Sequence, residues 1–284
     1  MTDRVLIVGL DGATWTVLEP YLAAGVLPNI ARLREAGVWG ELRSTIPPLS
    51  APAWATFMTG KDPSRHGVFH FRQHGSEGIV DGRNIDSATI WDTLSHQGRR
   101  SIVVNMPMTY PPRPLSGVMV TGLLTPPDAA TFTYPPELSA ELTDYQIDLD
   151  RFIDRKPFAA EEGGKREVEA DAVLMAEFHA MEERRGRAAL ELIQTEPWDV
   201  FAVVFTATDR MGHYLWQYHL DQQLPGDGES WALHQAVVDF YKMVDASIGE
   251  LVAAAGEDTM VVLASDHGMG PSYTKMAHWN DWLF

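Results

Sequence analysis

Short apolar runs alternate with longer helix-favouring segments along this chain, and this alternation constrains the fold more than any other feature. The runs expected to form buried strands are residues 5–10, 101–105, 118–121, 198–205 and 259–264. The segments expected to form helices are residues 15–24, 27–36, 52–58, 89–96, 157–195 and 231–255. Much of the stretch 107–136 is rich in proline and threonine and is expected to be loop. This order predicts an α/β fold with a doubly wound, mostly parallel sheet and helices on both faces.

The length and composition suit a single domain. With 284 residues, of which 45% are hydrophobic, the chain can form the core of one large α/β sheet. It contains no internal repeat, low-complexity tract or linker-like stretch. We therefore expect one domain over residues 1–284, with residues 123–195 as an inserted or covering segment. Within that segment, one apolar helical stripe is formed by Val168, Ala172, Met175, Phe178 and Met181.

Charge and cysteine content exclude several classes of function. The formal net charge of -17 disfavours binding to nucleic-acid polymers, which depends on clustered Lys and Arg. The absence of cysteine excludes disulfides and thiolate ligands, so any metal must bind to oxygen and nitrogen. The sequence shows no signal peptide and no apolar run of membrane-spanning length, so a cytoplasmic location without membrane contact is expected. The oligomeric state stays open.

Acidic and histidine residues closely follow three of the expected strands. Asp11 follows the first, Asp209 and His213 follow the run 198–205, and Asp266 and His267 follow the last. Because open α/β sheets bind ligands at the carboxyl ends of their strands, these side chains are expected at one edge. Simpler roles stay open for each group: helix capping by Asp11, a surface ion pair between Asp209 and His213, and a turn with a solvated histidine for the last pair.

Ser50 is the candidate nucleophile. Pro52 at the expected first helical position places Ser50 just before a short helix, where an anion would meet free backbone N–H groups. The simpler role of Ser50 is to help to cap that helix. No Ser/His/Asp triad or nucleophile elbow is legible around it, so coordination to a metal is the expected route of activation.

The ligand set favours two-metal phosphoryl transfer. Carboxylate oxygens and imidazole nitrogens together suit zinc, with manganese as the second choice. Two such divalent ions can stabilise the attacking and the leaving oxygen of a phosphoester at the same time. A small phosphoester is therefore the expected substrate.

Four segments together resemble the alkaline phosphatase superfamily, and within it the type I phosphodiesterase/nucleotide pyrophosphatase group. They are VGLDGATW, STIPPLSAPAWATFMTGKDPSRHGV, FTATDRMGH and VVLASDHGMGP, in the order that the family shows. The segments NMPMTYPPRP and VTGLLTPP are similar to a branch described as predicted phosphohydrolases or phosphomutases. The resemblance covers nearly the whole chain and implies an alkaline phosphatase-like fold.

The resemblance also implies roles for the residues. Asp11, Ser50, Asp266 and His267 would surround one metal, with Ser50 transiently phosphorylated. Asp209 and His213 would belong to a second metal, which in the family takes a further histidine from downstream. The only later histidine is His278, in a stretch that resembles a different family segment, so the C-terminal part of the family fold is expected to be missing from this chain.

Substrate contacts follow from the same comparison. Ala51, next to the nucleophile, is expected to bind substrate. Diesterases of this group often have an asparagine after the HG motif, and here His70 or Arg72 is expected to replace it. Sulfatases require an arginine at the position of Trp54, so sulfatase activity is not expected.

The expected activity is hydrolysis of a phosphodiester or phosphomonoester through a phosphoserine. A phosphomutase that uses the same serine and metals is the alternative enzyme. A binding module with an incomplete metal site is the non-enzyme alternative. The segment 123–195 is expected to act as a partial lid that influences substrate choice.

Overall fold

The computed structural model describes residues 4–73, 75, 77–148, 168–219 and 228–271. In chain order its helices and strands are β1 (Arg4–Leu10), α1 (Trp15–Ala23), α2 (Pro28–Ala36), α3 (Ser50–Thr59), α4 (Pro63–His66), η1 (Gly82–Asn84), α5 (Ile90–His96), β2 (Ser101–Met106), β3 (Gly117–Thr121), β4 (Thr133–Tyr134), η2 (Pro136–Ala140), α6 (Val168–Thr195), β5 (Val200–Phe205), α7 (Ala207–Leu215), η4 (Trp216–Tyr218), α8 (Gly228–Ala255) and β6 (Thr259–Ala264).

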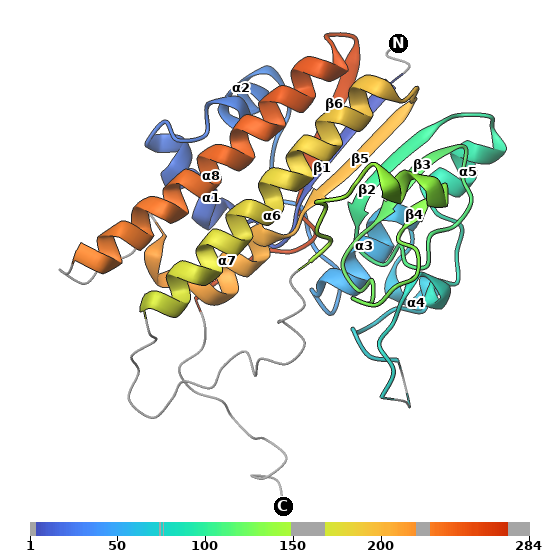
Figure 1. Cartoon of the computed structure of the whole chain (residues 1–284), viewed down its shortest axis with the longest axis horizontal. Helices are drawn as coiled ribbons and strands as arrows, with labels where there is room; N and C mark the ends of the chain where they lie inside the picture. Colours follow the sequence, from blue (N-terminus) through green and yellow to red (C-terminus); the bar gives the residue numbers. More distant parts are fainter. Residues whose placement is uncertain (1–3, 74, 76, 149–167, 220–227, 272–284) are drawn as a thin grey trace, which may run out of the picture.

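The strands form one six-stranded sheet in the order β4-β3-β2-β5-β1-β6. All neighbours pair in parallel except β3 and β4, which are antiparallel. Helices cover both faces, with α1, α2, α6, α7 and α8 on one side and α3, α4 and α5 on the other (Figure 1). The expected mostly parallel, doubly wound α/β fold is thus confirmed.

Alternate side chains of the central strands enter two separate cores, as the strand period of two requires. Leu6 and Val8 of β1 pack with α6 and α8, whereas Ile7 packs with Trp54 and Met58 of α3. Both faces of the sheet are therefore buried, which explains why β1, β2 and β5 are nearly continuous apolar runs.

Several sequence expectations differ in detail from the structure. Helix α3 begins at Ser50 instead of Pro52, because Leu49 takes the extended N-cap conformation and the proline occupies the third helical position. The two-residue strand β4 lies inside the stretch expected to be mostly loop. Of the apolar stripe expected on α6, Met175, Phe178 and Met181 are buried, but Ala172 is exposed and the neighbouring Leu174 takes its place in the core.

Part of the segment 123–195 can be described. Its helix α6 packs along α8 and over the sheet (Figure 1). The expected helical residues 157–167 and His278 lie outside the described residues. The described helices include none with the length and apolar character that crossing a membrane requires.

Candidate functional site

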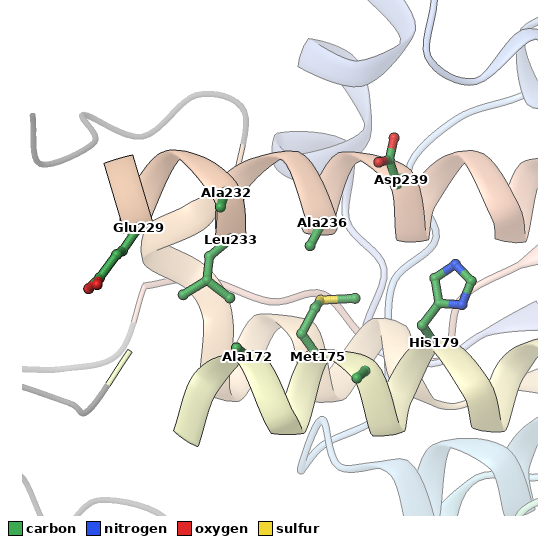
Figure 2. Close-up of a pocket in the computed structure, with 9 residues that line it drawn as sticks. Ala172, Met175, His179, Glu229, Ala232, Leu233, Ala236 and Asp239 are labelled. Atoms are coloured by element: carbon green, nitrogen blue, oxygen red, sulfur yellow. The ribbon is translucent and has the colours of Figure 1, made fainter. Parts of the chain in front are cut away.

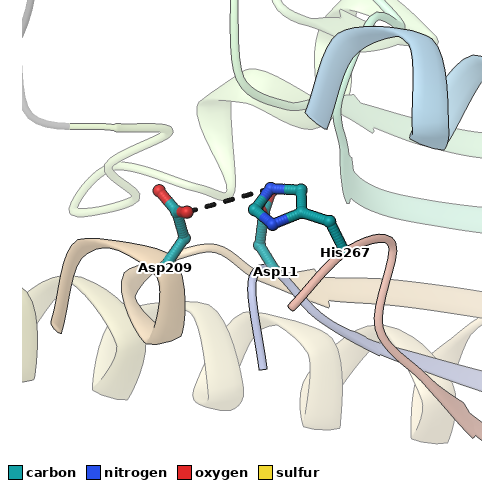
Figure 3. Close-up of side chains that lie close together, drawn as sticks. All are labelled: Asp11, Asp209 and His267. Atoms are coloured by element: carbon teal, nitrogen blue, oxygen red, sulfur yellow. Dashed lines mark ion pairs between the residues drawn. The ribbon is translucent and has the colours of Figure 1, made fainter. Parts of the chain in front are cut away.

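Three neighbouring strands bring the acidic segments together at the carboxyl edge of the sheet. Asp11 follows β1 directly, Asp209 lies in the first turn of α7 after β5, and His267 follows β6. One ligand atom from each of these three residues lies within 4.8 Å of the others (Figure 3). Because β5, β1 and β6 are adjacent in the sheet, residues that are about 250 positions apart in the sequence share one site.

The His267 imidazole is aimed at the carboxylates. Its Nε2 lies 3.5 Å from Asp11 Oδ1, 3.5 Å from Asp266 Oδ2 and 3.9 Å from Asp209 Oδ1. Its Nδ1 lies 2.9 Å from the carbonyl oxygen of Gly268. A carbonyl only accepts hydrogen bonds, so Nδ1 carries a proton, and Nε2 is the ring nitrogen that faces the three acids and could bind a metal through its lone pair. A backbone carbonyl commonly holds metal-binding histidines in this way.

Ser50 lies at the first helical position of α3, against the same cluster. Its Oγ donates a hydrogen bond to Asp11 Oδ1 over 3.1 Å and lies 3.0 Å from His267 Nε2. The backbone N–H groups of Ser50 and Ala51 lie in the first turn, where no intrahelical acceptor exists. The hydroxyl therefore meets the acidic cluster at a helix end that favours anions.

Two buried carboxylate oxygens lack a hydrogen bond of good geometry within the described part of the chain, although His213 Nε2 lies 3.4 Å from the first of them. They are Asp209 Oδ1 and Asp266 Oδ2, and both face His267 Nε2. Buried oxygens without donors are costly, which makes this position unfavourable for the protein alone. Three buried acids and an imidazole lone pair form the donor set that a divalent cation binds, so these residues fit a metal ion.

The pKa values show the same electrostatic conflict. Burial, together with the nearby charges of Asp266 and Asp209, raises the pKa of Asp11 well above its usual value. Burial raises the pKa of Asp266 to about 6. Burial also acts to raise the pKa of Asp209, but His213, Arg210 and His267 lower it overall. Clustered acids with shifted pKa values of this kind are typical of functional sites.

The contacts of the acids in the structure differ from those that the simpler roles would produce. Asp11 does not cap α1, whose N-cap is Thr14, but binds Ser50 and Trp54. Asp209 is buried, so its contact with His213, at 3.4 Å, is not a surface ion pair between two exposed groups. Asp266 Oδ1 accepts a hydrogen bond from the backbone N–H of Gly12.

The structure does not separate the expected ligands into two distinct groups. Asp209 and His213 were assigned to a second metal, yet Asp209 also lies within reach of Asp11 and His267. His213 is the more exposed partner, with 41% of its side chain accessible. The presence of two ions and the assignment of each ligand to one of them stay predictions.

The expected substrate residues behave differently from the ligands. Ala51 adjoins Ser50 in α3, but His70 and Arg72 lie on an exposed segment after α4. There Arg72 pairs with Glu77, and its backbone N–H donates to His70 Nδ1. Substrate contact by these three residues stays a prediction.

Four further residues hold the ligands in place, and sequence reasoning assigned none of them this role. Trp54 Nε1 donates to Asp11 Oδ2 over 3.0 Å. Thr208 Oγ1 donates to the carbonyl oxygen of Asp11 over 2.6 Å. Gly12 has a left-handed φ of 64°, and an added Cβ would lie 2.9 Å from Asp209 Oδ1. Arg210 pairs with Asp209 and with Asp148. Only their position inside the motifs signals these roles.

A cavity of about 530 Å³ lies elsewhere, between α6 and α8 (Figure 2). Its lining is mainly small or apolar, including Ala172, Met175 and Ala232, with Glu229 and Asp239 at its border. None of the clustered acids or Ser50 lines it. The candidate catalytic chemistry therefore belongs to the sheet edge and not to this cavity.

The fold and the cluster define an open α/β-sheet protein with a serine and a candidate cation site at the carboxyl edge of the sheet. Residues 5–284 match the family model "Type I phosphodiesterase / nucleotide pyrophosphatase". The chain belongs to this family, which is part of the alkaline phosphatase superfamily, as its motifs predicted. A search of curated protein sequences gives no match.

Solved structures share the fold. Phosphonoacetate hydrolase from Sinorhizobium meliloti 1021, in complex with phosphonoacetate, has a TM-score of 0.60 and 20% identity, covering 95% of this chain and 57% of that one. A putative sulfatase from Bacteroides thetaiotaomicron VPI-5482 has a TM-score of 0.55 and 14% identity, covering 97% of this chain and 62% of that one. At these identities the likeness shows the alkaline phosphatase-like fold alone. The chain spans about three fifths of the length of these proteins.

Proposed function

We propose that this chain carries the catalytic site of a metal-dependent phosphoester hydrolase, with Ser50 as the nucleophile and a phosphoserine as the intermediate. The observation that carries the proposal is the position of Ser50 Oγ, 3.1 Å from Asp11 Oδ1 and 3.0 Å from His267 Nε2. A serine hydroxyl reacts only when its environment activates it, and this one adjoins the candidate cation site.

The residues that would hold metal are Asp11, Ser50, Asp209, His213, Asp266 and His267. We propose two divalent ions, zinc before manganese, because the ligands are carboxylates and imidazoles without thiolates. Such ions would lower the pKa of the serine hydroxyl and offset the charge on the phosphoryl oxygens.

The chain's own groups account for the transfer. Ser50 Oγ forms a bond to phosphorus while the bond from phosphorus to the leaving oxygen breaks. The hydroxyl proton has an acceptor within hydrogen-bond reach, Asp11 Oδ1. The first-turn N–H groups of Ser50 and Ala51 offer donors to the transferred phosphoryl group. The leaving oxygen departs and takes up a proton from solvent. Attack by water on the phosphoserine then restores the hydroxyl and releases phosphate from a monoester substrate, or a phosphomonoester from a diester substrate.

A small phosphoester is the substrate class that we propose. The phosphonoacetate in the related solved structure is a small anion that carries a phosphonate group, which agrees with such a site. Sulfate esters are not proposed, although sulfatases share the fold, because Trp54 stands where their motif requires arginine. In this structure that tryptophan instead binds Asp11.

The test compares Ser50→Ala with wild type and with Ser139→Ala, a change at a half-buried serine of η2 whose hydroxyl donates to the carbonyl oxygen of Pro136. Each protein is loaded with zinc or manganese and assayed with p-nitrophenyl phosphate and bis-p-nitrophenyl phosphate. We expect Ser50→Ala to lose turnover by about a thousandfold or more, while Ser139→Ala keeps it. Acid quenching followed by mass spectrometry should detect one phosphoryl group on the peptide that contains Ser50. Turnover of Ser50→Ala at the wild-type rate, or no turnover by the loaded wild type, would overturn the proposal.

A further inference from the structure

A buried carboxylate from another helix caps the helix that carries Asp209. Helix α7 begins after Thr206, whose own side chain forms no capping hydrogen bond. Instead, Glu182 Oε1 on α6 accepts a hydrogen bond from the backbone N–H of Ala207 over 2.6 Å. The N–H groups of a first helical turn need such an acceptor, and a carboxylate there also favours the helix dipole.

The charge of this cap is balanced by Arg185, one turn further along α6. Both side chains are fully buried, and Arg185 Nη1 is paired with Glu182 Oε2. The same Nη1 donates to Thr206 Oγ1 over 3.1 Å, and Nη2 donates to the carbonyl oxygen of Ile147 over 2.7 Å. The Glu182–Arg185 pair thus contacts the two residues that begin α7, Thr206 and Ala207.

The first turn of α7 is held from a second side as well. Thr208 Oγ1 donates to the carbonyl oxygen of Asp11 over 2.6 Å, which ties α7 to the end of β1. Asp209 follows directly, and its Oδ1 is the oxygen that faces His267. Asp209 is thus placed by Thr208 on the sheet side and by Glu182 on the α6 side.

We propose that Glu182 is a positioning residue for the cation site, acting through the backbone of α7 to hold Asp209 at the distance from Asp11 that a divalent ion requires. This inference rests on the proposed function, since it assumes that these acids bind metal. Groups that orient metal ligands commonly change metal affinity by about 10–100-fold when they are removed.

The chain offers a matched control, a second buried acid that caps the N-terminus of another helix. Asp245 is a buried carboxylate on α8 that caps α2, accepting hydrogen bonds from the backbone N–H groups of Asn29 and Ile30. Helix α2 carries none of the proposed ligands. Removing either acid deprives a helix of a cap that comes from a neighbouring long helix, but only Glu182 supports a helix with a ligand.

The experiment measures Zn²⁺ affinity of the full chain by competition with a chromophoric chelator, together with the Tm of each metal-free variant. One variant combines Glu182→Met with Arg185→Met, which removes both charges and keeps the side-chain volume, a change that often preserves folding. A second combines Glu182→Gln with Arg185→Met, which keeps an oxygen for the Ala207 N–H. The control is Asp245→Ala.

We expect the double methionine variant to bind Zn²⁺ at least about tenfold more weakly than wild type. The glutamine variant should stay within about threefold, because it restores the cap, and Asp245→Ala should lower the Tm without changing affinity. Wild-type affinity in the folded double methionine variant would overturn the inference, as would a glutamine variant that binds more than tenfold more weakly than wild type. The affinity of the glutamine variant tests the inference even if the double methionine variant does not fold. Failure of wild type to bind Zn²⁺ would instead overturn the proposed function, and this inference with it.

Discussion

Trp54 Nε1 donates a hydrogen bond to Asp11 Oδ2 over 3.0 Å, and both side chains are almost completely buried. This contact occupies one carboxylate oxygen and leaves Asp11 Oδ1 for Ser50 and His267. The indole therefore sets the orientation of a carboxylate that adjoins the nucleophile. A buried donor to a charged acceptor is among the stronger hydrogen bonds in proteins.

For Trp54→Phe we expect catalysis to suffer more than stability. The substitution removes the donor but keeps an aromatic ring, so kcat/KM should fall by about tenfold or more while the free energy of unfolding falls by about 1–3 kcal/mol. The matched control is Trp91→Phe, because Trp91 is buried in the same core but on α5. Steady-state kinetics and urea unfolding measure the two effects. Equal losses of kcat/KM in both variants would assign Trp54 a packing role only.

Gly12→Ala should disrupt the site because the added methyl group would displace Asp209. Gly12 has φ 64°, and the added methyl group would lie 2.9 Å from Asp209 Oδ1. Gly25→Ala is the control, because Gly25 has φ 71° and no atom within 4 Å of an added Cβ. Both changes cost about 1–2 kcal/mol of backbone strain. We expect Zn²⁺ affinity to fall by about tenfold or more only in Gly12→Ala, as measured by calorimetric titration. Unchanged affinity in Gly12→Ala would show that the site absorbs the methyl group.

The strands and the gathering of Asp11, Asp209 and His267 at one sheet edge could be predicted from the sequence because both follow from local signals. An apolar run of six residues such as 200–205 identifies a buried strand, and an acid just after it lies at the carboxyl edge by the geometry of parallel sheets. Strand β4 was not predicted because a strand of two residues is too short to show the alternation of apolar and polar side chains. Helix α3 was placed two residues late because Pro52, usually a first-position residue, occupies the third position here.

The supporting contacts could not be predicted, for a physical reason. The Trp54–Asp11 bond spans 43 positions and the Glu182–Ala207 bond spans 25 positions. Such pairs depend on how α3 and α6 pack on the sheet, which side-chain periodicity does not determine. The sequence around a helical glutamate or tryptophan shows the same periodicity whether its side chain contacts a candidate ligand or only packs in the core.

In metal-free protein, Asp266 should lower stability near neutral pH. Its folded-state pKa is raised to about 6 from a usual value of 3.8, so the folded state holds the proton more tightly than the unfolded chain. Stability from this group is present below about pH 4 and is lost as pH rises through about 6. At about 1.4 kcal/mol per pKa unit, the cost at pH 7 reaches about 3 kcal/mol.

Asp266→Asn removes this cost, and its side-chain oxygen can still accept the hydrogen bond from Gly12. With chelator present, we expect the variant to have a higher Tm than wild type at pH 7 and a similar Tm at pH 4. Adding Zn²⁺ should raise the Tm of wild type but not that of the variant. At a Zn²⁺ concentration of a hundred times the Kd, the free energy of unfolding of wild type should rise by about 2.7 kcal/mol. Differential scanning fluorimetry across this pH range measures both effects. A variant less stable than wild type at pH 7 in chelator would contradict the assignment of Asp266 as a strained ligand.

Arg210→Lys should weaken the site although it keeps the positive charge. Arg210 bridges two carboxylates, with Nη1 3.2 Å from Asp209 Oδ2 and Nη2 2.9 Å from Asp148 Oδ2. A lysine ammonium lacks the planar fork that holds two acids in fixed directions, so Asp209 would be less well oriented. We expect Zn²⁺ affinity to fall by about tenfold. The control is Arg187→Lys, because Arg187 forms an exposed ion pair with Asp144 on the outer side of α6, and exposed pairs contribute little. If the two variants bind Zn²⁺ equally well, the planar fork of Arg210 is not needed to orient Asp209.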